Sequence, residues 1–128
     1  MDWHTWTIIG VAVAAFLLLK RLTLVQPDAA RDWLKQGARV IDVRSEGEFK
    51  GGHLPGAVNI PLDRLGAEIA RIAPDKDQPL LLHCLSGTHS GMGKARLKKL
   101  GYCKIFNLGS YGRAERILGS RGEVGRKG

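Results

Sequence analysis

Short apolar runs alternate along this chain with stretches in which apolar residues recur every three or four positions, and this alternation limits the fold more than any other feature. Leu80–Leu82 is a continuous apolar run that follows Pro79. Such a run suits a strand that is covered on both faces, as in a parallel sheet. Residues 62–72 instead have the spacing of an amphipathic helix. The sequence therefore predicts an α/β domain with a central, mainly parallel sheet flanked by helices.

Turn residues and apolar spacing together place the expected elements along the chain. Ser90 is expected to cap the helix that follows it, and Met92, Ala95 and Leu100 to share one face of that helix. Cys103 is expected to be a core residue of the last strand. The predicted strands cover residues 22–25, 40–44, 57–60, 80–83 and 102–107, and the predicted helices cover residues 27–36, 45–50, 62–73, 91–100 and 111–118.

The segment Cys84–Ser90 is the candidate site. It places a thiol at the end of a predicted strand, followed by a loop that contains Gly87 and by the start of a helix. Unpaired N–H groups at a helix start and in a tight loop stabilise an anion, and the thiolate is the nucleophilic form of cysteine. Asp42 and Arg44 also follow a predicted strand, and sites in parallel sheets lie at that edge. The alternative is a buried cysteine without reactivity.

The apolar segment at residues 3–19 is expected to be a membrane anchor. As a helix it would be about 26 Å long, at the short end of what crosses a bilayer. Trp3 and Trp6 lie near one end, and Lys20 and Arg21 follow the other. By the positive-inside rule, residues 1–21 form an uncleaved, single-pass transmembrane helix of the cytoplasmic membrane, and the domain faces the cytoplasm. A buried core helix and a cleaved leader are the alternatives.

Composition narrows the class of partner. The 128 residues carry a net charge of +8, which favours an anionic substrate or an anionic membrane surface. The sequence has neither a basic stripe with interleaved aromatic residues nor a nucleic-acid-binding motif, so no nucleic-acid partner is expected. Cys84 and Cys103 form neither a disulfide framework nor a metal site. Residues 22–118 are expected to form one domain, and residues 119–128 a disordered basic tail.

Several motifs in this domain resemble those of the single-domain rhodaneses. They are Asp42-Val43-Arg44, Glu48-Phe49, the ten residues from Gly52 to Pro61, and Cys84-Leu85-Ser86-Gly87. The resemblance extends over residues 22–118. It implies a rhodanese-like fold and a sulfurtransferase that needs no cofactor or metal.

The same resemblance assigns roles to individual residues. It implies that Cys84 takes the outer sulfur of an anionic donor such as thiosulfate, carries it as a persulfide and passes it to a thiol or cyanide. Asp42 and Arg44 would support the neighbouring loop. The donor would be bound by the main-chain N–H groups of Leu85, Ser86, Gly87, Thr88, His89 and Ser90.

Two departures from the family pattern keep alternatives open. Leu85 and His89 stand where many rhodaneses carry a cation. One alternative is therefore a membrane-tethered module that binds a protein partner or senses redox state without significant turnover. A cysteine phosphatase or arsenate reductase is disfavoured, because no arginine lies between Cys84 and Ser90 to clamp the oxyanion. The stretch Asn107–Tyr111 also departs from the usual Asn-Leu-x-Gly-Gly.

Overall fold

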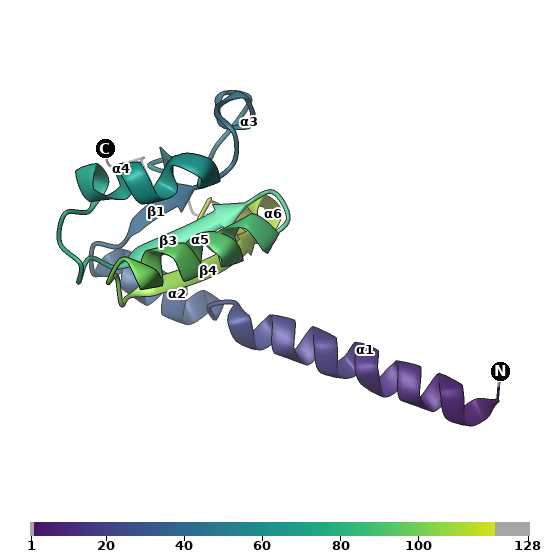
Figure 1. Ribbon diagram of the computed structural model, residues 1–128. Helices are drawn as coiled ribbons and strands as arrows, with labels where there is room; N and C mark the ends of the chain where they lie inside the picture. Colours follow the sequence, from purple (N-terminus) through teal and green to yellow (C-terminus); the bar gives the residue numbers. More distant parts are fainter. Residues whose placement is uncertain (1, 120–128) are drawn as a thin grey trace.

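The computed structural model describes residues 2–119, and its centre is a four-stranded parallel sheet (Figure 1). The strand order is β2-β1-β3-β4, with every neighbouring pair parallel. The predicted α/β domain with a mainly parallel sheet is confirmed. The strands are β1 (Arg39–Asp42), β2 (Val58–Asn59), β3 (Leu80–Cys84) and β4 (Ile105–Ser110).

Helices cover both faces of the sheet, which gives three layers (Figure 1). Apolar residues of α4 (Leu65–Ile72) and α5 (Thr88–Lys99) pack in one core cluster. Those of α2 (Pro27–Lys35) and α6 (Tyr111–Ile117) pack in the other. Successive residues of β3 alternate between the clusters, as strand geometry requires: Leu82 and Cys84 face α4 and α5, and Leu81 faces α2 and α6. The thiol therefore lies on the α5 side.

Two short helical elements connect the strands near the site. Helix α3 (Glu46–Lys50) begins at Ser45, whose hydroxyl accepts a hydrogen bond from the Glu48 N–H while the Glu48 carboxylate accepts one from the Ser45 N–H. This capping box satisfies two free donors at the helix start. The 3-10 helix η1 (Leu62–Arg64) leads directly into α4, so the predicted helix at residues 62–73 is present in two parts.

Two strand predictions are wrong at the edges of the sheet. Residues 22–25 form no strand, because α1 (Trp3–Thr23) continues into this segment. The Val25 N–H bonds to the Asn107 carbonyl at 2.9 Å. The last strand begins at Ile105 rather than at Tyr102. Tyr102 is a core residue whose hydroxyl donates to a backbone carbonyl. Cys103 lies outside the strands and is exposed, so its prediction as a core residue is also wrong.

Helix α5 buries a different face from the predicted one. Met92 is 46% exposed and Leu100 is 43% exposed, whereas Ser90, Gly93 and Leu97 are buried. A side chain at Gly93 would have its Cβ 3.0 Å from Leu82. The small residues therefore let α5 lie close against β3, and apolar periodicity cannot indicate a face formed by small residues.

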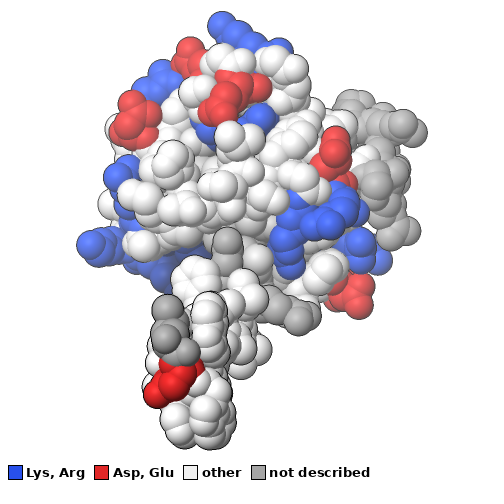
Figure 2. Space-filling view, turned by 90° about the vertical axis from the view of Figure 1, so that its right-hand side faces the viewer, with Lys and Arg blue, Asp and Glu red and all other residues white. Residues whose placement is uncertain are grey.

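Helix α1 projects from the domain and exposes its large apolar side chains (Figure 1). Figure 2 shows Lys, Arg, Asp and Glu side chains gathered on the domain, while much of the projecting helix that it colours is white. Within residues 2–119, no helix combines the length and apolarity that crossing a bilayer demands. The transmembrane helix predicted at residues 3–19 is thus not found in the described part of the chain. The predicted cytoplasmic-membrane location stays a prediction. Residues 120–128 of the predicted tail lie outside the described residues.

Candidate active site

The thiol of Cys84 lies at the end of β3, beneath the loop that joins β3 to α5. Its sulfur accepts hydrogen bonds from the N–H of Gly87, at 2.9 Å, and from the N–H of Ser90, at 3.3 Å. The side chain is only 1% exposed, with core residues on one side and these amides on the other. Two donors aimed at one sulfur favour a negative charge there.

Gly87 gives the loop the shape that aims these donors. Its φ of +97° lies in the left-handed region, which a residue with a Cβ rarely adopts. A Cβ at this position would also meet the backbone of Gly109 at 3.4 Å, so the loop packs directly on the end of β4. Gly87 is the N-cap of α5. The prediction that Ser90 caps this helix is wrong, because Ser90 lies inside the first turn and its hydroxyl bonds elsewhere.

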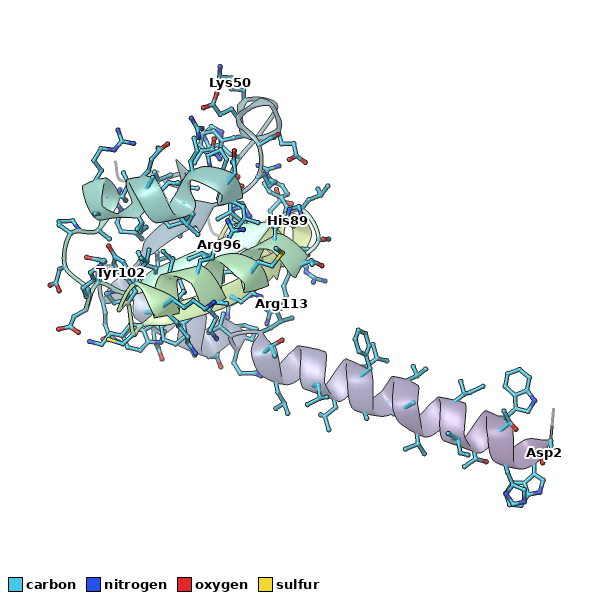
Figure 3. All side chains as sticks on the ribbon, in the orientation of Figure 1. Asp2, Lys50, His89, Arg96, Tyr102 and Arg113 are labelled. Atoms are coloured by element: carbon cyan, nitrogen blue, oxygen red, sulfur yellow. The ribbon has the colours of Figure 1, made fainter. Side chains whose placement is uncertain are left out.

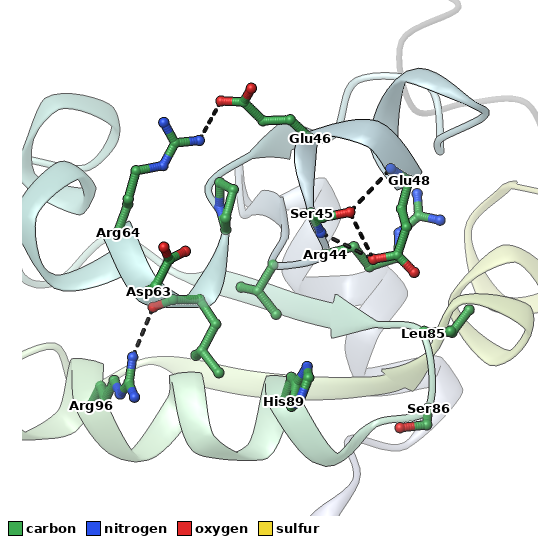
Figure 4. Close-up of a pocket in the computed structure, with 13 residues that line it drawn as sticks. Arg44, Ser45, Glu46, Glu48, Asp63, Arg64, Leu85, Ser86, His89 and Arg96 are labelled. Carbon is green, nitrogen blue, oxygen red and sulfur yellow. Dashed lines mark hydrogen bonds and ion pairs between the residues drawn. The ribbon is translucent and has the colours of Figure 1, made fainter.

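A pocket of about 750 Å³ opens beside the loop (Figure 4). Its walls come from the segment after β1, from α3 and η1, from Leu85 and Ser86 of the loop, and from α5, including His89 in its first turn. Leu85 is 63% exposed, and the loop contributes no permanently charged side chain. Figure 3 shows His89 and Arg96 along the side of α5 that faces α4. The pocket therefore extends from the loop along α5.

Three arginines supply the positive charge of this pocket. Arg64 pairs with Glu46, and this hydrogen bond lowers the pKa of Glu46. Arg44 pairs with Asp42 at 2.7 Å. Within residues 2–119, Arg96 makes no ion pair, and its guanidinium donates to the carbonyl of Leu62 at 2.8 Å. Arg96 is therefore the arginine of this pocket that pairs directly with no carboxylate of the described residues, although Glu46, Glu48 and Asp63 also line the pocket.

The Asp42–Arg44 pair is buried and holds the loop after α3. Both carboxylate oxygens of Asp42 accept from the Arg44 guanidinium, which also donates to the carbonyl of Gly52 at 2.8 Å. Hydrogen bonding to Asp42 raises the pKa of Arg44. The guanidinium lies 4.5 Å from the centre of the Tyr111 ring. Asn59 donates to the carbonyls of Asp42 and Arg44, which fixes the chain at this point.

His83 precedes Cys84 but lies on the opposite face of the sheet. It is fully buried, and within the described residues neither ring nitrogen has a hydrogen-bond partner. Burial lowers the pKa of His83, although its Nε2 lies 3.8 Å from Asp42. A neutral ring on the far side of β3 is not placed to act as a base for the Cys84 thiol.

These features match a known family. The family model for the rhodanese-like domain matches residues 26–112. The chain belongs to the rhodanese family. Among curated relatives, the Bacillus subtilis protein YqhL, described as uncharacterized, is 37% identical over 98 residues, which are 75% of each chain. The Escherichia coli thiosulfate sulfurtransferase PspE is 38% identical over 69 residues, which cover 54% of this chain and 66% of PspE.

Solved structures agree with this rhodanese fold. An E. coli rhodanese described with anions is 34% identical, with a TM-score of 0.59, and the match covers 60% of this chain and 91% of that one. The human single-domain sulfurtransferase TSTD1 is 28% identical, with a TM-score of 0.63, and the match covers 73% of this chain and 96% of TSTD1. The fold is thus shared with proteins named for sulfur transfer.

The rhodanese loop brings together most, though not all, of the predicted binding residues. The amides of Gly87 and Ser90 reach the sulfur, and Leu85, Ser86 and His89 line the pocket. Thr88 instead lines a second pocket, on another side of the loop, together with Lys94 and Lys98. The roles of these residues in binding and catalysis stay predictions. Within residues 2–119, no group of three or more His, Cys, Asp or Glu side chains is placed to hold a metal ion.

Asn107 is the residue of this site that sequence reasoning missed. It lies on β4, is almost fully buried, and its side-chain oxygen is 2.6 Å from the Ser90 hydroxyl. The resemblance of Asn107–Tyr111 to the Asn-Leu-x-Gly-Gly motif could have drawn attention to this residue. The motif does not show which side chain Asn107 contacts.

Proposed function

We propose that this rhodanese is a sulfurtransferase that moves a sulfane sulfur from an anionic donor of the thiosulfate class to a thiol or cyanide, by way of a persulfide on Cys84. One observation carries the proposal: the Cys84 sulfur accepts hydrogen bonds from the amides of Gly87 and Ser90 at the carboxyl edge of a parallel sheet. The relatives named as thiosulfate sulfurtransferases support the same chemistry.

In the first step the Cys84 thiolate attacks the outer sulfur of thiosulfate. A new S–S bond forms to Cys84, the S–S bond of the donor breaks, and sulfite leaves with its electron pair. The product is a persulfide whose outer sulfur carries the negative charge. Preorganised amide donors stabilise such charge in a site closed to water, because they need no reorganisation when the charge forms.

In the second step the acceptor attacks the outer sulfur of the persulfide. The bond between that sulfur and Cys84 breaks, and its electron pair returns to Cys84 as a thiolate. Cyanide yields thiocyanate, and a thiolate acceptor yields its own persulfide. The cycle therefore needs no external oxidant, reductant or cofactor.

The net charge of the chain suits an anionic donor, whereas the pocket itself is lined by three arginines and by the carboxylates of Glu46, Glu48 and Asp63. Arg44 and Arg64 are paired with carboxylates, while Arg96 makes no ion pair within residues 2–119. The net charge of +8 raises the local concentration of anions around the whole domain. The E. coli rhodanese described with anions has the same fold. The donor is therefore bound by loop amides, with the arginines contributing attraction at longer range.

The two cysteines offer a matched test. Cys84→Ser should abolish thiocyanate formation from thiosulfate and cyanide, whereas Cys103→Ser should retain it, since Cys103 is exposed and outside the site. Thermal unfolding of both variants shows that the fold is kept. A Cys84→Ser protein that works at the wild-type rate would show that the nucleophile is elsewhere.

A second candidate is a binding module with no significant turnover. Exposed Leu85 at the mouth of the pocket, where a cation is absent, and the exposed apolar surface of α1 favour it. In that case purified protein would turn over none of several sulfane donors. A specific protein partner would also be retained by the Cys84→Ser variant.

A further inference from the structure

The hydroxyl of Ser90 has one proton and three acceptors around it. Its oxygen lies 2.6 Å from Oδ1 of Asn107, 3.0 Å from the carbonyl of Gly87 and 3.5 Å from the Cys84 sulfur. Ser90 is fully buried and Asn107 nearly so. Because a hydroxyl donates only one hydrogen bond, these acceptors compete for it.

The orientation of Asn107 decides the competition when Cys84 is protonated. The N–H of Gly109 donates to Oδ1 of Asn107 at 2.8 Å, so the oxygen of the amide, not its nitrogen, faces this corner. Ser90 then donates to Oδ1, the closest acceptor, and its lone pair accepts the S–H of Cys84. This chain of hydrogen bonds suits the neutral thiol.

Loss of the Cys84 proton reverses the hydrogen bond between Cys84 and Ser90. The thiolate accepts hydrogen bonds, so a Ser90 lone pair pointing at it is unfavourable, and the hydroxyl must turn from Asn107 to donate to the sulfur. Gly87 and Ser90 already supply two backbone donors. The Ser90 hydroxyl would be the third donor, but it already donates its hydrogen bond to Oδ1 of Asn107.

We propose that Asn107 is a positioning residue that sets how readily Cys84 becomes a thiolate, by competing with the sulfur for the hydroxyl proton of Ser90. This inference rests on the proposed function for its consequence in sulfur transfer. The competition itself concerns only the proton of Cys84 and is measurable without any sulfur donor.

Other ionisable groups surround the loop and stay constant across the variants. His89 and Arg44 line the pocket, Lys94 lies on α5 beside the second pocket, and His83 lies on the far face of the sheet. Arg113 of α6 donates to the carbonyl of Leu108 on β4. Their effects cancel when variants at position 107 are compared with one another.

The test measures the pH at which alkylation of Cys84 by iodoacetamide reaches half its maximal rate, in a Cys103→Ser background. Asn107→Ala removes the competitor, so this pH should fall by roughly one unit, the scale of one hydrogen bond to a charged group. Asn107→Asp is a stronger acceptor and adds a negative charge, so the same pH should rise. The charge added by Asn107→Asp raises this pH even without competition for the Ser90 hydroxyl. Asn107→Ala therefore decides, and an unchanged or raised pH in that variant would overturn the proposal.

A double-mutant cycle with Ser90→Ala isolates the hydroxyl. Without the Ser90 hydroxyl, Asn107→Ala should no longer lower the alkylation pH, and an undiminished shift would overturn the proposal. If Asn107→Ala does not fold, Asn107→Asp is used instead. Asn107→Asp should raise the alkylation pH more when Ser90 is present than in the Ser90→Ala background. Equal shifts in the two backgrounds would overturn the proposal. Altered alkylation with no persulfide formed on thiosulfate would instead reject the proposed function alone.

Discussion

Gly93 is the position where a single methyl group should test the packing of the site most sharply. A Cβ there would lie 3.0 Å from Cδ2 of Leu82 and 3.1 Å from Cδ2 of Leu65, and both leucines are fully buried. Overpacking of this kind costs roughly 1–3 kcal/mol. Replacing a helical glycine by alanine recovers about 0.5–1 kcal/mol. Gly93→Ala should therefore lower the free energy of unfolding by about 1 kcal/mol, the middle of a range of about 0–2.5 kcal/mol.

The same helix provides the matched control. A Cβ at Gly91 would lie 3.6 Å from Nδ2 of Asn107, an ordinary contact, so Gly91→Ala should gain the helix propensity without the clash. Urea unfolding of the two variants should place Gly93→Ala below the wild type and Gly91→Ala at or above it. A Gly93→Ala protein as stable as Gly91→Ala would refute the close packing of α5 on β3.

Three further changes probe the charges around the loop. Arg44→Met leaves the buried Asp42 carboxylate without its partner and should lower the free energy of unfolding in urea by roughly 3–5 kcal/mol. Arg71→Met, at the surface, should change it by less than about 1 kcal/mol. Equal effects of the two changes would argue against a buried pair. His89→Arg should lower the KM for thiosulfate, and an unchanged KM would show that this side chain does not face the donor. Burial lowers the pKa of His83, so the unfolded chain takes up this proton first, and the melting temperature should fall as the pH drops below about 6.5. His83→Leu should remove that part of the pH dependence, and parallel curves for the two proteins would contradict it.

The centre of the sheet and the position of Cys84 at its edge could be predicted from the sequence. Leu80–Leu82 is apolar throughout because β3 has helices on both faces, and a strand of that kind leaves few alternatives. The end of such a strand lies at the carboxyl edge of the sheet, and Cys84 is found there, as the last residue of β3. The cap at Ser45 was also predictable, because capping depends on residues three positions apart.

Features that depend on contacts between distant segments were not predictable in the same way. Ser90 follows a loop and has the residue type of a helix cap, yet its hydroxyl bonds to Asn107, 17 residues further along the chain. The buried face of α5 contains Gly93, so hydropathy does not mark it. The last strand was predicted to begin at Tyr102, because aromatic residues are typical of strands, but Tyr102 packs in the core from outside the sheet and β4 begins at Ile105.

The most direct test of the central claim is the intact mass of the protein after incubation with thiosulfate. The account predicts one added sulfur atom, mapped to Cys84 by peptide analysis, removed by cyanide, retained in Cys103→Ser and absent in Cys84→Ser. Added sulfur on Cys103 alone, or none on any residue while thiocyanate is still produced, would contradict the persulfide at the end of β3.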